Sequence, residues 1–385
     1  MSRYAAYLRT ASQFIESYSG EIPFSRYIKS AFSQSKKYGA TDRRLISGLC
    51  HSFFRVGYLV SGSLTHRILA GWFITRNNTD DLLETLNPQW SGQVTVSLSE
   101  KLKLFGIPEA SLFPGLSYVS DELDKSAIAL SVLEQPLLYV RIRPGHEEVV
   151  LRKLDDARIA YHREDRNTLS FANSTSLDKV LSINKEVVIQ DLNSQRVFDA
   201  LSHHLFNKSP IMVWDCCAAS GGKSALIYDR YNGNVVLTVS DIRKSILHQL
   251  DVRMKEADIP IADLFMADLT QGEVKHGTFD FIICDVPCSG SGTWARTPEQ
   301  LSQFNKDIII DYAHLQRTIV EHSIHSLQPG GVLSYITCSI FKAENEENVH
   351  YLLNNTKLTL LDKRYLPGYT CKADTLFSAL FQLAD

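Results

Sequence analysis

Phe279-Asp-Phe-Ile-Ile-Cys-Asp-Val-Pro-Cys288-Ser-Gly-Ser-Gly292 is the stretch that decides the fold of this chain. Its first half is mostly apolar, which is typical of a strand covered on both faces in a parallel sheet. The proline and the two glycines that follow end the strand and let another molecule approach the backbone. In open α/β sheets, ligands bind beyond the carboxyl ends of the strands. We therefore expect a ligand site beside Asp285 and Cys288.

A second stretch of the same design, Gly330-Gly-Val-Leu-Ser-Tyr-Ile-Thr-Cys338-Ser339, follows a Pro-Gly turn signal. It also ends in a cysteine. If both strands belong to one parallel sheet, Cys288 and Cys338 emerge at the same edge and face one crevice. A single cysteine at a strand end is most often buried and inert. Two cysteines at matching positions favour a functional pair.

The composition is that of an ordinary globular chain. Its 385 residues suit two or three domains, at about 150 residues each. The apolar runs are shorter than the roughly 18 residues that a membrane span needs, and residues 1–20 contain no signal-peptide core. Seven cysteines without a CxxC pair indicate reduced thiols and neither a disulfide framework nor a zinc site. We expect a cytoplasmic monomer that binds no metal and no membrane.

The charge is unevenly distributed along the chain. The formal net charge is −3, which argues against a generally basic nucleic-acid coat. Residues 1–80, however, carry 11 lysines and arginines against four acidic residues. This excess predicts a phosphate-binding face as readily as an ordinary solvated surface.

Residues 1–134 have helical periodicity, which predicts an all-helical domain. Asp42 is expected to cap a helix that begins near Arg43. The apolar faces of three helices are Tyr4, Tyr7, Leu8, Ala11 and Phe14; Phe24, Tyr27, Ile28 and Phe32; and Leu45, Leu49, Phe53 and Phe54. Weaker helices are expected at Ser63–Arg76, Asp80–Leu86, Ser97–Phe105 and Asp121–Leu133, with Pro88, Pro108 and Pro114 as breakers.

Residues 135–192 predict a small α+β subdomain, a common platform for single-stranded RNA. Tyr139, Arg141 and Arg143 are candidate RNA contacts, although an inward tyrosine and outward arginines on a half-buried strand have the same pattern. The expected strands are Leu137–Arg143, Arg158–Arg163, Thr168–Phe171 and Glu186–Gln190, and the expected helices are His146–Ala157 and Ser176–Leu181.

Residues 193–385 alternate strands and helices, which predicts an α/β, Rossmann-like doubly wound sheet. The expected strands are Ile211–Cys216, Asn234–Ser240, Asp263–Ala267, Phe279–Cys284, Gly331–Thr337, Leu358–Leu361 and Phe377–Gln382. The expected helices are Lys223–Arg230, Arg243–Ala257, Lys306–Leu327 and Ala343–Leu353.

The first strand of this sheet runs into a loop of small residues, Asp215-Cys-Cys-Ala-Ala-Ser-Gly-Gly-Lys-Ser224. The loop opens a helix whose free amides attract a carboxylate or a phosphate. Neither the Walker spacing nor the dinucleotide GxGxxG is present. Asp241, which closes the second strand, can bind ribose hydroxyls, and Asp268, which ends the third, can receive an adenine amino group. S-adenosylmethionine is the cofactor that fits best.

These motifs, in order and spacing, resemble those of the RsmB/NSUN family of RNA (cytosine-5) methyltransferases. The resemblance implies that Cys338 is the nucleophile and that Cys288 assists release of the product. Asp285 either donates to the cytosine ring or anchors the cofactor. The cofactor-binding residues would be Cys217, Ala218, Ala219, Ser220, Gly221, Gly222, Lys223, Asp241, Asp268 and Asp285.

The N-terminal part resembles the NusB-like domain of the RsmB branch, which implies small-subunit rRNA as the substrate. A base must be unstacked to reach a buried thiol, so this RNA should be single-stranded or opened. Two positions depart from the family pattern. Ser220 stands in place of a proline, and the tail Ala373–Ala379 lacks the usual Asp-Gly-Phe-Phe run. Two alternatives therefore remain open: a catalytically silent RNA-binding paralogue, and a methyltransferase that acts on another substrate.

Overall fold

The computed structural model describes residues 2–35, 37–203, 209–272, 274 and 276–384. The basic residue Lys36 of the N-terminal set therefore lies outside the described residues. The chain forms two compact units. Unit 1 consists of Met1–Ser117, Asp124–Gln135 and Trp294–Asn305, and unit 2 of Tyr118–Leu123, Pro136–Thr293 and Lys306–Asp385.

Unit 1 is helical, as its periodicity predicts. The helix α3 begins at Ala40 and not near Arg43, and Asp42 caps it from its third position by accepting a hydrogen bond from Gly39 N over 2.8 Å. Pro88 opens the short helix α6, because a proline is tolerated at the first helical position. The helices are α1 (Arg3–Glu16), α2 (Phe24–Ser33), α3 (Ala40–Arg55), α4 (Leu64–Ile74), α5 (Asp81–Leu86), α6 (Pro88–Ser91), α7 (Leu98–Leu104), α8 (Lys125–Ser131) and α13 (Glu299–Ser302).

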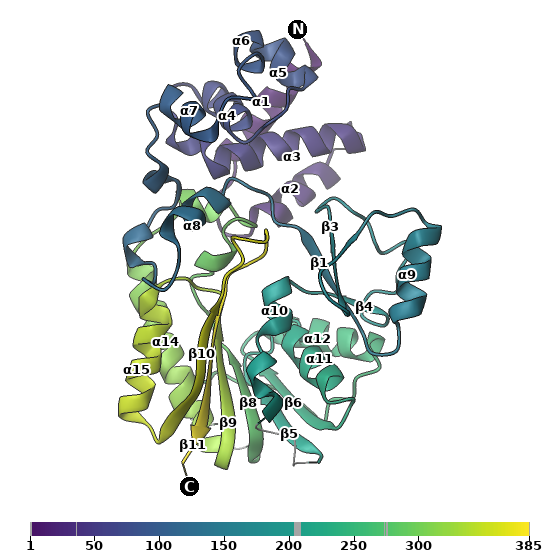
Figure 1. The fold of residues 1–385 in the computed structure, drawn as a ribbon, viewed down its shortest axis with the longest axis vertical. Helices are drawn as coiled ribbons and strands as arrows, with labels where there is room; N and C mark the ends of the chain where they lie inside the picture. Colours follow the sequence, from purple (N-terminus) through teal and green to yellow (C-terminus); the bar gives the residue numbers. More distant parts are fainter. Residues whose placement is uncertain (1, 36, 204–208, 273, 275, 385) are drawn as a thin grey trace. The chain divides into compact units, whose positions relative to one another are not determined.

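Unit 2 contains a seven-stranded mixed sheet in the order β10-β11-β9-β8-β5-β6-β7 (Figure 1). The strands β9, β8, β5, β6 and β7 are parallel, and β11 runs antiparallel between β9 and β10. The bounds are β5 (Ile211–Asp215), β6 (Val235–Asp241), β7 (Asp263–Met266), β8 (Phe279–Asp285), β9 (Leu327–Thr337), β10 (Leu358–Leu366) and β11 (Leu376–Leu383).

Helices cover both faces of this sheet, which explains why its central strands are apolar on both sides. Phe281 and Ile283 pack with residues of α11 and α12, whereas Ile282 and Cys284 pack with residues of α14 and α15. Figure 1 shows these two helix pairs on opposite sides of the sheet. Their bounds are α10 (Leu192–Arg196), α11 (Gly222–Arg230), α12 (Lys244–Glu256), α14 (Asp307–Ser323) and α15 (Glu346–Asn355), with α10 preceding the first strand of the sheet.

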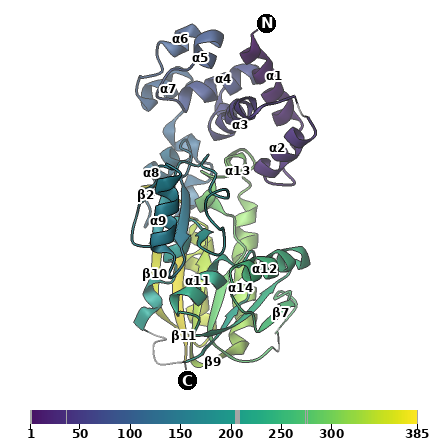
Figure 2. The same cartoon turned by 90° about the vertical axis from the view of Figure 1, so that its right-hand side faces the viewer.

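A small antiparallel sheet in the order β2-β3-β1-β4 belongs to the same unit and is covered by α9 (Figures 1 and 2). Its elements are β1 (Leu138–Ile142), α9 (Glu147–Asp156), β2 (His162–Arg163), β3 (Thr168–Phe171) and β4 (Val187–Ile189). The helix predicted at Ser176–Leu181 is wrong. The segment forms a single turn in which Leu181 N donates to Leu177 O over 2.8 Å. Both leucines are buried by this turn, and so short a segment does not sustain a helix by itself.

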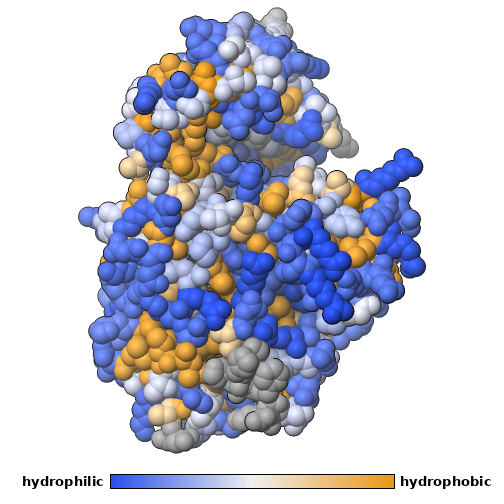
Figure 3. Space-filling view, in the orientation of Figure 1, coloured by the Kyte–Doolittle hydropathy of each residue, from blue (hydrophilic) through white to orange (hydrophobic). Residues whose placement is uncertain are grey.

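The surface of unit 2 seen in Figure 3 is mostly hydrophilic, with an apolar area over the ends of α15 and β10. The edge strand β10 carries Asp362, Lys363 and Arg364 and a register shift after Leu360. Charges and irregular pairing of this kind discourage another strand from pairing with an exposed sheet edge. Among the helices of the described chain, none has the length and apolar content that a bilayer crossing requires.

Candidate functional site

Two cysteines meet at the carboxyl ends of the neighbouring parallel strands β8 and β9. Cys288 and Cys338 follow these strands, and their Sγ atoms lie 3.2 Å apart. Both side chains are partly exposed. The structure thus brings the two thiols together at one edge of the sheet.

The backbone around this pair is closely packed. Gly292 N donates to Cys338 O over 2.8 Å, and Thr375 N donates to Gly292 O over 2.9 Å. A Cβ atom at position 292 would lie 2.0 Å from the Thr375 oxygen. Only glycine therefore fits here, and the altered tail around Thr375 still closes over the cysteine loop.

The buried carboxylate of Glu344 joins the two cysteine loops, a role that the sequence did not indicate. It accepts hydrogen bonds from Ser289 N (2.9 Å), Ser339 Oγ (2.7 Å) and Gln316 Nε2 (2.9 Å). Gln316 also donates to Pro287 O over 2.9 Å. Burial raises the pKa of Glu344, although its hydrogen-bond donors oppose this shift. Each loop is thus tied to the same carboxyl group.

The two thiols have different electrostatic surroundings. The hydrogen bond to Cys338 is the largest cause that raises the pKa of Cys288, followed by burial, and the charge of Glu344 adds to the effect. Cys288 is therefore held as a protonated thiol. On the other side, Lys223 interacts electrostatically with Cys338. The positive charge of Lys223 therefore acts on Cys338.

Lys223 also forms an ion pair with Asp285, with Nζ 2.6 Å from Oδ2. Burial opposes the charge of Lys223, but Asp285 and Cys338 outweigh it, and the pKa of Lys223 is raised. This ion pair orients the carboxyl group of Asp285. Asp285 is therefore arranged as a hydrogen-bond acceptor at the edge of the pair.

The glycine-rich loop after β5 has the shape that a close-lying ligand requires. Gly221 has φ +79°, and a Cβ atom there would lie 2.4 Å from Met254 Cε. Ala219 has φ +45°, and its N–H donates to Asp241 Oδ2 over 3.0 Å. Ser220, the position that departs from the family pattern, is held by Arg253, which donates to its carbonyl and hydroxyl oxygens over 3.0 and 3.1 Å. The loop keeps its shape without the proline.

Asp215 supplies an orphaned polar atom beneath this loop. Its Oδ2 accepts from Ser224 Oγ over 2.6 Å, whereas its buried Oδ1 has no protein hydrogen-bond partner. Burial raises the pKa of Asp215 to about 7. A buried oxygen without a partner is suited to a donor group on a bound ligand. The tight loop, the first amides of α11 and this oxygen together fit a cofactor with a charged amino-acid tail.

The two remaining cofactor candidates lie at the ends of β6 and beyond β7. Asp241 is 5% exposed and accepts hydrogen bonds from Arg243, whose side chain is itself exposed. Asp268 accepts from Thr270 N and Oγ1 over 3.0 and 2.6 Å. Both carboxylates lie after parallel strands that are neighbours in the sheet.

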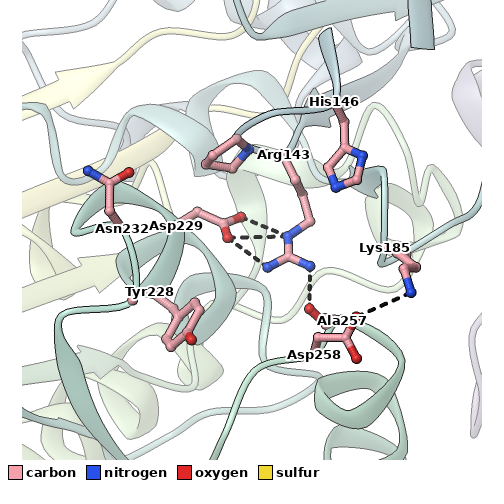
Figure 4. A pocket seen from close by; sticks show the side chains of 10 residues that line it. Arg143, His146, Lys185, Tyr228, Asp229, Asn232, Ala257 and Asp258 are labelled. Atoms are coloured by element: carbon pink, nitrogen blue, oxygen red, sulfur yellow. Dashed lines mark hydrogen bonds and ion pairs between the residues drawn. The ribbon is translucent and has the colours of Figure 1, made fainter. Parts of the chain in front are cut away.

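The residues predicted to contact RNA from the small sheet are used inside unit 2 instead. Arg141 Nη1 lies 2.6 Å and Arg143 Nη2 2.8 Å from the carboxylate of Asp229, and Arg143 also donates to Ala257 O (Figure 4). Tyr139 donates its hydroxyl to Cys371 O. The prediction is wrong for Tyr139 and Arg141, which are 2% and 6% exposed. A pocket of about 380 Å³ adjoins Arg143, but its cations already face carboxylates.

The chain is similar to a known family and to several known proteins. A family model described as 16S rRNA methyltransferase RsmB/F matches residues 204–374. Ribosomal RNA small subunit methyltransferase F of Pectobacterium atrosepticum is 30% identical over 165 residues, which are 43% of this chain and 34% of that protein. Ribosomal RNA small subunit methyltransferase B of Xylella fastidiosa is 32% identical over 177 residues, which are 44% of this chain and 40% of that protein. The matches thus span well under half of these relatives' length.

Solved structures share the fold. The crystal structure of PH0851 superposes with a TM-score of 0.73 at 19% identity and covers 96% of both chains. The structure of NSun6 from Pyrococcus horikoshii superposes with a TM-score of 0.59 at 16% identity, covering 68% of this chain and 94% of that one.

Proposed function

Since residues 204–374 belong to the RsmB/F family of rRNA methyltransferases, we propose that this protein methylates carbon 5 of a cytosine in small-subunit rRNA with S-adenosylmethionine as the cofactor. The observation that carries the proposal is the pair of thiols, Cys288 and Cys338, whose sulfur atoms lie 3.2 Å apart. Lys223, from the glycine-rich loop, forms an ion pair with Asp285 at the end of β8. Methylation of a ring nitrogen or of a hydroxyl group needs no such pair.

Cys338 acts as the nucleophile. Carbon 5 of cytosine is too weakly nucleophilic to take a methyl group by itself. The Cys338 thiolate adds to carbon 6, which forms the S–C6 bond and moves the ring electrons toward carbon 5 and nitrogen 3. Lys223 interacts electrostatically with Cys338. S-adenosylmethionine supplies the electrophilic methyl group that the activated carbon 5 attacks.

Cys288 completes the reaction. After methylation, the carbon 5 proton must leave and the S–C6 bond must break, which restores the C5=C6 double bond and frees Cys338. We assign Cys288 to accept the carbon 5 proton, because it lies against Cys338. It does so as a thiolate, after its own proton has passed to solvent, and its raised pKa then makes it a strong base. Asp285, which is paired with Lys223, would accept a hydrogen bond from the cytosine amino group or from the cofactor's ammonium group.

The loop Cys217–Lys223 would hold the cofactor, and the Asp215 oxygen would accept a hydrogen bond from its amino-acid tail. Asp241, which pairs with the exposed Arg243, would bind the ribose hydroxyls. Asp268 would receive the adenine amino group.

We propose that three parts divide the work. Residues 1–134 form a NusB-like RNA-binding domain, residues 135–192 an RNA-binding subdomain, and residues 193–385 the catalytic domain. Because the reacting carbon must reach a partly buried thiol, the target cytosine is unstacked or already single-stranded.

The test is methyl transfer from labelled S-adenosylmethionine to an unmodified 16S rRNA transcript, followed by bisulfite sequencing. We expect incorporation at one or a few cytosines, lost in a Cys338→Ala variant. Label that appears at carbon 5 without Cys338 would overturn the mechanism. No transfer to rRNA by the folded wild-type protein would overturn the function and favour a catalytically silent paralogue.

A further inference from the structure

A basic pocket lies between α2 and α3 of unit 1, which are neighbours in Figure 1. Its volume is about 280 Å³. The lining residues are Ile28, Lys29, Phe32, Arg43, Arg44 and Ser47. We call this set the α2–α3 groove.

The groove is strongly cationic. Three of its six lining residues are basic and none is acidic. Lys29, Arg43 and Arg44 are all exposed, and within the described part of unit 1 the structure gives none of them a carboxylate partner. Arg43 is oriented by a hydrogen bond from Nε to Tyr38 O over 3.0 Å and by contact with the Phe32 ring, 5.7 Å from the ring centroid. In the small antiparallel sheet and its helix α9, by contrast, most basic side chains already form ion pairs with carboxylates.

Two of these cations stand where a helix disfavours them. α3 begins at Ala40, so Arg43 and Arg44 are its fourth and fifth residues, near its positively polarised N-terminal end. A cation near such an end is unfavourable. Asp42 accepts hydrogen bonds from Gly39 N and from the Tyr7 hydroxyl and forms no ion pair with either arginine in the described part of unit 1. Three cations and no acidic residue line the groove, so it favours an anion.

The floor of the groove is apolar. Ile28 and Phe32 are each 5% exposed, and the Ser47 side chain lies beside them. A ribose or the edge of a base can pack against such a floor while guanidinium groups bind the adjoining phosphate. The volume of the groove suits about one nucleotide. A protein partner recognised by charge alone has no need of this floor.

We propose that the α2–α3 groove is a docking site for the sugar-phosphate backbone of the RNA substrate, remote in sequence from the methyl-transfer site. This inference rests on the proposed function for the identity of the polyanion. Its role is to bind rRNA and not to react with it. Loss of the groove should therefore raise KM and leave kcat unchanged.

The test compares two double variants that remove equal charge. The Lys29→Gln/Arg44→Gln variant removes two of the three cationic side chains that line the groove. Arg26→Gln/Lys103→Gln removes two exposed cations of the same unit that do not line the groove. The probe is a fluorescently labelled 16S rRNA transcript, measured by anisotropy between 50 and 200 mM salt, and circular dichroism checks that each variant folds.

We expect the groove variant to weaken binding about 10-fold and to reduce the slope of log Kd against log[salt] by about 1–2, because about 0.7–0.9 counterions are released per phosphate contact. The control variant should stay within about 2-fold of wild type. Equal effects of both variants would overturn the groove in favour of a diffuse charge effect.

The groove and the function can fail separately. If the wild-type protein transfers no methyl group but the groove variant still loses RNA binding, the function falls and the docking site stands. If the wild-type protein methylates rRNA and the groove variant keeps its KM and salt slope, the docking site falls. Binding of inorganic phosphate to both variants alike would also count against the groove.

Discussion

Ser289, directly after Cys288, donates its backbone N–H to the carboxylate of Glu344 over 2.9 Å. The same carboxylate accepts from Ser339, directly after Cys338, over 2.7 Å. One buried side chain thereby fixes both loops that present the thiols. The separation of the two sulfur atoms depends on a residue that touches neither the cofactor loop nor the sulfur atoms themselves.

A Glu344→Gln variant should test this dependence. The amide group keeps the volume of the carboxylate but turns an NH₂ donor toward groups that are themselves donors. We expect methyl transfer to fall about 10–100-fold, because a small misplacement of reacting groups has such effects, and the free energy of unfolding to fall by about 1–3 kcal/mol.

The matched control is Glu347→Gln, an exposed position three residues later. Its unfolding free energy should stay within about 0.5 kcal/mol of wild type. Single-turnover rates and urea denaturation measure both effects. Equal activity of the two variants would show that the loops hold their positions without Glu344.

A Cys288→Ala variant should trap the substrate. Removing the thiol that lies 3.2 Å from Cys338 leaves addition to carbon 6 possible but removes the proposed assistance to release. RNA then accumulates on Cys338 as a slow-migrating band in denaturing gels, which nuclease removes. The double variant with Cys338→Ala should give no band. A band that persists in the double variant would place the covalent bond elsewhere.

Asp215 should make stability depend on pH in a defined direction. Burial raises its pKa to about 7 in the folded chain, whereas an unfolded aspartate titrates near about 4. Between these values the folded state binds more protons, so the contribution of this group to stability is lost as the pH rises.

Relative to Asp215→Asn, the wild-type unfolding free energy should therefore fall by about 2–4 kcal/mol between roughly pH 4 and pH 7 and stay level above pH 7. Urea denaturation of both proteins at several pH values measures the difference. A difference that does not change with pH would mean that the carboxyl group titrates in its ordinary range.

Asp229→Asn should destabilise unit 2 strongly. It leaves Arg141 and Arg143, both largely buried, without their shared carboxylate, and breaking a buried pair costs about 3–5 kcal/mol. The control is Asp251→Asn, which breaks the exposed pair with Lys255 and should cost less than about 1 kcal/mol. Thermal denaturation compares the two. Similar melting temperatures would show that the arginines find other acceptors.

The sequence predicts those parts of the fold that depend on short segments. Apolar runs at β8 and β9, each ending in a cysteine, place Cys288 and Cys338 at one sheet edge because parallel neighbours end together. The small residues after Asp215 predict the tight turn of the cofactor loop. Gly221 has a positive φ in this turn, which glycine adopts without strain.

Long-range partners are not encoded in such patterns. Glu344 stands in a run of charged residues that reads as an exposed helix start, and nothing local distinguishes it from Glu346 or Glu347. Asp229 lies 88 residues from Arg141, so their pairing depends on how two sheets pack. A local pattern can also mislead. The leucine spacing at Ser176–Leu181 suits a helix, but a single turn already buries both leucines.

The shared aspartate of α11 also constrains how this chain can be recombined with its relatives. Two guanidinium groups from β1 and its following loop depend on one acceptor carried more than 80 residues downstream. A chimera that exchanges only residues 136–192 would bring a foreign surface to that acceptor, or leave it facing no cation. We therefore expect a chimera to fold more readily when the small sheet and α11 are exchanged together than when either is exchanged alone.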